Sequence, residues 1–321
     1  MKKYILPVLI CILFASCDKK SKIENEIEEI PLEQVKVERL DKIFYETPIN
    51  DFPKVRNQYS YIFQPDVPDA VYTSKIQDPI WREVYTEVQK KYSNFEPQKS
   101  QLEDLFKHIK FYFPKSKTPK VITLINEMDY NTKTIYADSL VFISLELYLG
   151  KDHKFYQFPA YIKENFTERQ MMPDIVSSFA LRKIAPPKSK TLLEEMIYAG
   201  KELYLKDLLI PEFTDAEKIG YTPEQITWCQ ANEGYMWSYF VEKKMLYDSD
   251  SKLPGRFINL APFSKFYLEI DNETPGRVGT WVGWQIVRSF MQNNEVSLQQ
   301  LLQMDATEIF NKSKYKPKKD E

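Results

Sequence analysis

Apolar positions between residues 40 and 115 follow the pattern of helices packed on one another. They recur three or four residues apart, which places them along one face of a helix. Asp78-Pro79 opens one such run and Pro114 closes another. We therefore expect three or four helices here. Their apolar stripes are Phe52, Val55, Tyr59 and Ile62; Ile80, Val84, Tyr85 and Val88; and Leu102, Leu105, Phe106 and Ile109.

The pattern changes to that of a small sheet after residue 119. Segments 120–127, 134–137 and 140–145 are short and rich in β-branched residues, which predicts strands. Only a few residues connect them, so we expect antiparallel pairing. Weaker strand signals lie at Val35 and Val37, where apolar and polar residues alternate, and at 266–270.

The remainder of the chain again shows helical spacing. We expect helices at 168–184, 189–209, 222–246 and 298–310, with proline residues ending the first two. More than half of residues 35–321 should then be helical. The predicted fold class is α+β, predominantly helical with a small antiparallel sheet.

The stretch from Pro275 to Met291 is the most unusual of the helical segments. Thr274 can cap a helix that has Pro275 at its first position. Three glycines fall within eight residues, although glycine destabilises a helix by roughly 1 kcal/mol relative to alanine. We interpret the segment as a helix that another backbone approaches closely; the alternative is a helix facing a ligand or partner. The residues concerned are Gly276, Gly279, Trp281, Gly283 and Trp284.

The amino-terminal residues 1–16 have the pattern of a secretory signal. Two lysines precede an apolar run that is too short to span a bilayer, and Ala15-Ser16-Cys17 follows. Small residues before a cysteine resemble the lipoprotein signal box, which implies cleavage before Cys17 and its modification with acyl chains such as palmitate. The alternative is an ordinary signal peptide in which Cys17 occurs by chance.

The rest of the chain divides into a linker and one body. Residues 17–34 are charged and poor in aromatic residues, which favours a flexible tether, with a short amphipathic helix as the minor alternative. Residues 35–321 should form a single domain with a helical part at 40–115 and a second part at 120–310. Removing residues 1–16 changes the formal net charge from −2 to −4, a mild value that does not favour nucleic acid as a partner.

Sequence motifs of catalysis are scarce. The chain contains neither a GxGxxG nor a GxxxxGK[ST] phosphate loop and no GxSxG nucleophile turn. Its two histidines, His108 and His153, are best interpreted as a half-buried packing residue and a solvated loop residue. We expect no cofactor, no metal ion and no catalytic residue.

The order of elements from Leu140 onward resembles that of zincin metallopeptidases. The short sheet ends in FISLELYLG and is followed by PDIVSSFALRKI and LLEEMIYAGKELY. In zincins an HExxH helix supplies two zinc-binding histidines and a general base. Residues 168–184 contain no histidine, and Glu194, Glu195 and Glu202 are expected on a solvated helix face. The resemblance therefore implies a zincin-like fold without its metal site.

A second resemblance covers nearly the whole chain. The signal box, VERLD, LELYLG, PGRVGTWVGWQIVRSFM and KSKYKP occur in the order found in the gliding-motility lipoprotein B family (GldB). This resemblance implies a membrane-anchored envelope lipoprotein required for bacterial gliding. Two hypotheses follow: a non-catalytic component that docks other proteins of the motility or secretion machinery, and an envelope hydrolase of zincin ancestry.

Overall fold

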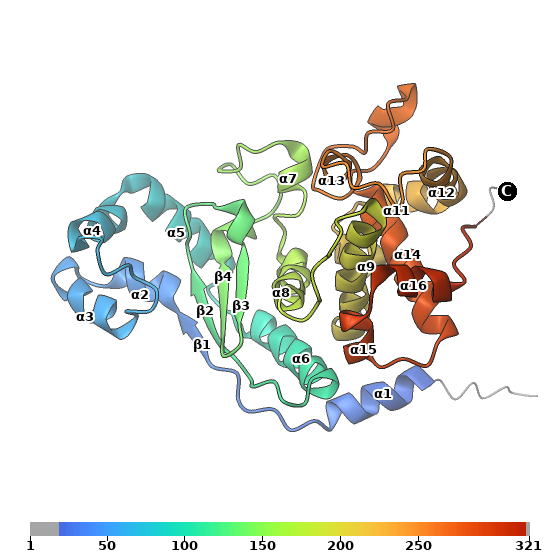
Figure 1. The fold of residues 1–321 in the computed structure, drawn as a ribbon. Helices are drawn as coiled ribbons and strands as arrows, with labels where there is room; N and C mark the ends of the chain where they lie inside the picture. The colour runs from blue at the N-terminus through green and yellow to red at the C-terminus, as the bar shows by residue number, and fades with distance from the viewer. Residues whose placement is uncertain (1–18, 319–321) are drawn as a thin grey trace, which may run out of the picture.

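A four-stranded mixed sheet lies at the centre of the molecule in the computed structural model, which describes residues 19–318 (Figure 1). The strand order is β1-β2-β4-β3. β1 and β4 both run parallel to β2, and only the β3–β4 hairpin is antiparallel. The strands are β1 (Val37–Arg39), β2 (Lys120–Leu124), β3 (Thr134–Ala137) and β4 (Leu140–Ser144).

The predicted antiparallel sheet is therefore wrong for two of the three strand pairs. The segment 125–133 carries the chain from β2 past the position next to it, so that β3 forms the edge of the sheet. β4 lies between β3 and β2. β4 then runs in the same direction as β2, in register from Lys120 with Leu140 to Leu124 with Ser144. A short connection predicts antiparallel pairing only where two consecutive strands are also neighbours in the sheet. This holds for β3 and β4 but not for β2 and β3.

The two faces of the sheet support different hydrophobic clusters. Ile122 on β2 joins a cluster with the helices that follow β1, against which Phe142 on β4 packs. Val121 and Val141 belong to the main core, on the opposite face of the pleat. Figure 1 shows the first group of helices at the left of the sheet. These helices are α2 (Leu40–Glu46), α3 (Phe52–Gln58) and α4 (Asp69–Gln77), with a 3-10 turn at Ile49–Asp51.

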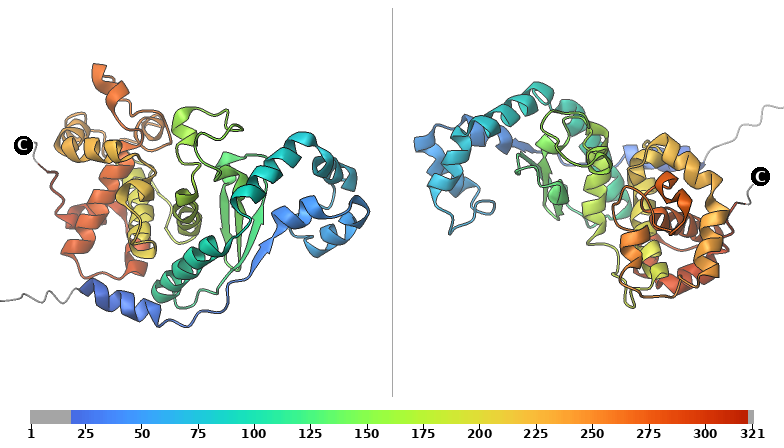
Figure 2. Two further views of the ribbon diagram at one scale, coloured as in Figure 1. Left: turned by 180° about the vertical axis from the view of Figure 1, so that it is seen from behind. Right: turned by 90° about the horizontal axis from the view of Figure 1, so that it is seen from above.

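The main core joins the sheet to the carboxyl-terminal helices, which Figure 2 shows in yellow to red at the opposite end of the molecule from α2, α3 and α4. α9 and α14 form the centre of this block, and shorter helices surround them. The α-helices from residue 79 onward are α5 (Pro79–Lys91), α6 (Glu96–Tyr112), α7 (Ala160–Lys163), α8 (Met171–Ala180), α9 (Leu192–Leu209), α10 (Asp215–Ile219), α11 (Pro223–Ala231), α12 (Glu233–Glu242), α13 (Leu253–Phe257), α14 (Val278–Asn293), α15 (Leu298–Gln303) and α16 (Ala306–Ser313).

Helical content agrees with the prediction. Helices hold 57% of the described residues, which confirms the predominantly helical class. Over residues 19–318, none of these helices combines the length and apolarity that a membrane span requires.

Several predicted boundaries differ in the structure. The segment 266–270 is not a strand; it leads into a 3-10 turn at Glu269–Glu273. The expected helix at 168–184 consists of a 3-10 turn at Glu168–Gln170 and α8, and 222–246 divides into α11 and α12. In the last case Asn232 ends α11 with its amide donating to the Trp228 carbonyl oxygen at 2.8 Å.

The start of α14 also differs from the prediction. The helix begins at Val278, because Arg277 adopts the left-handed conformation with φ of 62°. Thr274 does not cap it; its hydroxyl donates to the Ser264 carbonyl oxygen at 3.0 Å. Pro275 and Gly276 thus belong to the loop before the helix.

Most of the expected flexible tether is helical. α1 (Lys19–Glu28) packs on α6, with Ile27 buried and the Lys107 ammonium donating to the Glu28 carbonyl oxygen at 3.2 Å. The minor alternative, a short amphipathic helix, describes this segment better than a free chain does. Figure 1 shows α1 beneath α6.

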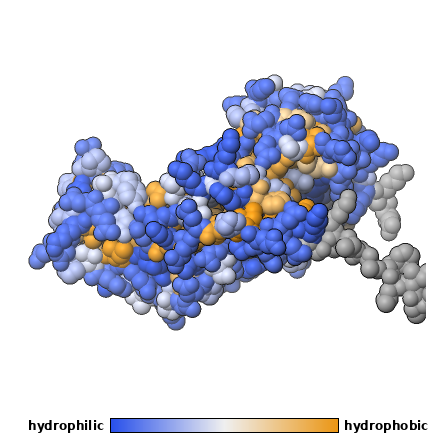
Figure 3. All heavy atoms as spheres, turned by 90° about the horizontal axis from the view of Figure 1, so that it is seen from below, coloured by the Kyte–Doolittle hydropathy of each residue, from blue (hydrophilic) through white to orange (hydrophobic). Residues whose placement is uncertain are grey.

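The lower face of the molecule, to which α1 belongs, has an uneven distribution of apolar side chains. Figure 3 shows them along a band that runs from one end of the molecule to the other. An open groove of about 710 Å³ lies where α6 ends near α8 and α15. Phe113, Tyr136 and Phe179 line it together with Lys115 and Lys183. Its lysines and aromatic rings make the groove partly basic and partly apolar.

Candidate functional site

The glycines of the segment 276–283 lie against other backbone segments. A Cβ on Gly283 would overlap the Met196 carbonyl oxygen of α9, and one on Gly276 would overlap that of Ala261. Gly279 faces the Phe257 carbonyl oxygen at the end of α13. Gly200 on α9 meets the Gly283 carbonyl in return, so the two helices cross in direct backbone contact.

The two tryptophans of this segment are also inside the protein. Trp281 and Trp284 are both buried. The Trp284 indole donates to Asp207 at 2.9 Å, and the Arg288 guanidinium stacks over its ring at 3.7 Å from the centroid. Arg288 in turn binds Asp207 and Asp215. This surface of α14 is a packing contact within the chain. Cys17, the predicted lipid site, lies outside the described residues.

A charged cavity of about 210 Å³ lies between α8 and α9 and beside the loop before α14. α8 contributes Asp174 and Ser177, which are three residues apart and therefore share a helix face. From α9, Glu202 lies opposite them, and the Ser177 hydroxyl donates to its carboxylate at 2.7 Å. The remaining charged lining residues are Lys133, Lys206, Lys218 and Arg277.

Each carboxylate at this cavity has a lysine partner. Lys133 pairs with Asp174, and Lys206 with Glu202 at 3.2 Å. Burial opposes ionisation of Glu202, but Lys206, the Ser177 hydroxyl and Arg277 hold the pKa of this carboxyl below its ordinary value. Glu202 is consequently an ionised, paired group, and the predicted solvated face is wrong for this residue.

The other residues singled out in the sequence do not join this cavity. Neither His108 nor His153 lines it. His153 is not a solvated loop residue; its side chain is only 14% exposed and its Nε2 atom lies 3.5 Å from Glu87. Glu194 accepts a hydrogen bond from the Ser189 backbone, at the start of α9 and two turns before Glu202. Within the described residues, histidine, cysteine, aspartate and glutamate nowhere form a group of three that could hold a metal ion.

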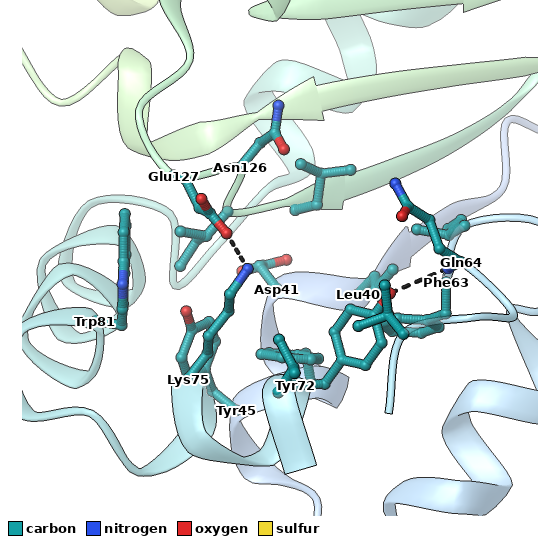
Figure 4. Close-up of a pocket in the computed structure, with 16 residues that line it drawn as sticks. Leu40, Asp41, Tyr45, Phe63, Gln64, Tyr72, Lys75, Trp81, Asn126 and Glu127 are labelled. Atoms are coloured by element: carbon teal, nitrogen blue, oxygen red, sulfur yellow. Dashed lines mark hydrogen bonds and ion pairs between the residues drawn. The ribbon is translucent and has the colours of Figure 1, made fainter. Parts of the chain in front are cut away.

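A second cavity, of about 360 Å³, lies between α2, α4 and the end of β2 (Figure 4). Its lining is mostly apolar and aromatic, with Tyr45, Phe63 and Tyr72 from one side and Trp81 from another. Lys75 extends across the view to pair with Glu127. Such a lining suits an apolar ligand better than a charged one.

Two buried carboxylates near this second cavity differ in how many of their oxygen atoms accept hydrogen bonds. Asp41 is buried and accepts hydrogen bonds from Arg39 at 2.9 Å and from Gln89 at 2.7 Å. Glu146 is fully buried; one oxygen accepts from the Asn126 backbone N–H at 2.7 Å, and the other has no partner. Burial raises the pKa of Glu146 to about 7, against the effect of its backbone hydrogen bonds. Glu146 therefore titrates near neutral pH.

Comparison with known proteins identifies the family. A family model described as "Gliding motility protein GldB" matches residues 20–317, so the chain belongs to this family. Membership indicates a lipoprotein with a role in gliding motility. No curated protein and no solved structure matches the chain, so the expected zincin-like fold has no support from a structural relative.

Sequence reasoning found the close-packed glycines but not the charged cavity. Asp174, Ser177 and Lys206 each interrupt an otherwise apolar helical stripe, which is a signal for a buried polar contact. Arg277 carried no sequence signal, because the left-handed conformation that directs it is typical of glycine and asparagine.

Proposed function

We propose that the protein is an envelope lipoprotein, anchored through acyl chains on Cys17, whose body is a non-catalytic docking component of the gliding machinery. Family membership supports the role in gliding. The signal pattern ending at Cys17 supports the anchor, since several acyl chains bind a bilayer stably.

The non-catalytic assignment rests on the cavity between α8 and α9. A serine nucleophile requires a general base that takes up its proton. The Ser177 hydroxyl donates a hydrogen bond to the Glu202 carboxylate, but this carboxylate is paired with Lys206 and its pKa is lowered, which makes it a weak base. No histidine lines the cavity to serve as a base or a metal ligand. Both of its carboxylates are paired with lysines, as expected of a binding or structural site.

The same arrangement supports zincin ancestry as a proposal. In zincins the metal helix presents its histidines toward a glutamate of the following helix. Here α8 presents Asp174 and Ser177 toward Glu202 of α9. We infer that α8 and α9 correspond to these two helices, with the metal ligands replaced. An envelope hydrolase of zincin ancestry is therefore the alternative function.

Metal content distinguishes the two functions. The purified full-length protein should contain far less than one zinc ion per chain by elemental analysis, because carboxylates paired with lysine are poor zinc ligands. About one ion per chain, lost in the Glu202→Gln variant and retained in Glu96→Gln, would favour the hydrolase. Glu96 is an exposed control on α6.

Substitution of the anchor tests the localisation. Cys17→Ala should abolish labelling with a palmitate analogue, leave the chain at unprocessed size and stop gliding, because acylation precedes cleavage of a lipoprotein signal. The buried Cys229→Ala variant is the control and should be labelled normally. Undiminished labelling of Cys17→Ala would reject the anchor.

A further inference from the structure

Arg277 stands between the charged cavity and the surface. The cavity and an outer groove of about 560 Å³ share three lining residues, Gly220, Leu260 and Arg277. The outer groove continues along Pro159 and Tyr161 on one side and Gln225 on the other. The two spaces therefore form one elongated site with a charged inner end.

The position of Arg277 is fixed by its surroundings. Its backbone is left-handed, with φ of 62°, a conformation that residues other than glycine adopt at a cost. Gly276 before it has no room for a Cβ against Ala261, and its carbonyl oxygen accepts from the buried Tyr221 hydroxyl. The next backbone N–H, of Val278, donates to Ser264 at 3.2 Å. The guanidinium is thus directed into the site before any ligand arrives.

Arg277 differs from the lysines of the site in having no carboxylate within ion-pair distance among the described residues, although its charge contributes to the lowered pKa of Glu202. Lys133 and Lys206 have carboxylate partners in the cavity, and Lys218 pairs with Asp207 at 3.3 Å. Across the described part of the chain, no carboxylate forms an ion pair with Arg277. Its guanidinium donates to the Ile219 carbonyl oxygen and lies over the Tyr221 ring at 5.5 Å, which leaves further N–H donors for a ligand.

We propose that this site binds the carboxylate end of a peptide segment, with the carboxylate on Arg277 and the preceding residues in the outer groove. An arginine fork matches a carboxylate with two parallel hydrogen bonds, and a single excess cation matches a single negative charge. The groove suits a short extended chain, because it combines the rings of Pro159 and Tyr161 with the polar Gln225. The inference extends the proposed docking function by giving it a site and a ligand class.

Binding of short peptides to the full-length protein in detergent tests the proposal. The probes are acetyl-Ala-Ala-Ala with a free carboxylate, the same peptide as its carboxyl-terminal amide, and acetate, each titrated by calorimetry. The free acid should bind saturably and at least tenfold more tightly than the amide or acetate. Equal binding of acid and amide, or no saturable binding, would overturn the site. Acetate binding as tightly as the peptide would overturn the peptide assignment in favour of a small acid.

Two variants locate the binding. Arg277→Gln should weaken binding of the acid at least tenfold, whereas Arg182→Gln, an exposed arginine paired with Asp138, should not change it. Leu260→Glu places a negative charge in the site from a side chain that is 46% exposed, so folding should be retained and binding lost. Unchanged affinity in either site variant contradicts the proposal. The proposed function does not depend on these binding tests, because labelling and gliding of the Cys17→Ala variant test the anchor and the docking role independently.

Discussion

Replacing Gly283 with alanine should lower the free energy of unfolding by about 3 kcal/mol, the upper end of what overpacking usually costs. The added methyl group would overlap the backbone of α9 at Met196, which cannot move without displacing the whole helix. Rotation of a side chain gives no relief, because both colliding parts are fixed to helix backbones. Urea unfolding, followed by tryptophan fluorescence, measures the change, provided that the slope of the transition is the same in both proteins.

Gly255 provides the matched control. It lies in the short helix α13, and a Cβ there would meet nothing within 4 Å. Gly255→Ala should be neutral or slightly stabilising, since alanine favours a helix and restricts the unfolded chain. A Gly283→Ala protein with an unchanged or higher midpoint would mean that α9 and α14 are not in contact at this point. The glycine surface would then be open to a partner.

The stability of the protein should fall as the pH rises through about 7, because of Glu146. Its pKa is about 7 in the folded protein and 4.5 as an ordinary carboxyl, so the folded state binds the extra proton between these values. The stabilisation is complete below pH 4.5, falls as the pH rises from there, and is lost once the pH has passed about 7, where the buried carboxyl ionises in the folded protein too. The loss amounts to roughly 2 kcal/mol between pH 5 and pH 9 for a shift of this size.

Glu146→Gln isolates this contribution. The amide oxygen can still accept from the Asn126 and Met128 backbone N–H groups, and the side chain no longer ionises. The free energy of unfolding of the variant should therefore change less with pH than that of the parent, when both are measured by urea unfolding from pH 5 to pH 9. The exposed Glu96→Gln should retain the parental profile. Identical pH profiles for parent and Glu146→Gln would contradict the assignment.

The sequence predicted local elements well and their arrangement poorly. Apolar spacing located α5, α6 and α9, because each helix buries one stripe against the core. The β-branched residues of β2 and β4, such as Val121 and Val141, indicated that these segments are strands. They did not indicate that the two strands run parallel. The order of a sheet depends on where a connection crosses, which is a property of the packed chain rather than of any window of residues.

The candidate site shows the same limit at the level of side chains. The glycines at 279 and 283 were informative because glycine in a helix needs a compensating contact. Glu202 was not, since a carboxylate on a helix is usually solvated. Only the approach of Ser177 from α8 and of Lys206 from the next turn of α9 converts it into a half-buried, paired group. Arg277 joins them from a loop 75 residues further along the chain.

The packing of α1 on α6 bears on how the body would meet its neighbours in the envelope. A free linker over residues 17–34 would let the body rotate about its anchor and sample many orientations. Ten of those residues instead form α1, which is packed on the body through the buried Ile27 and therefore moves together with it. For an anchor at Cys17, one side of the protein then persistently faces the bilayer. Under the proposed anchor and docking role, encounter with a membrane-embedded partner would be a lateral search in two dimensions by a body that is already oriented.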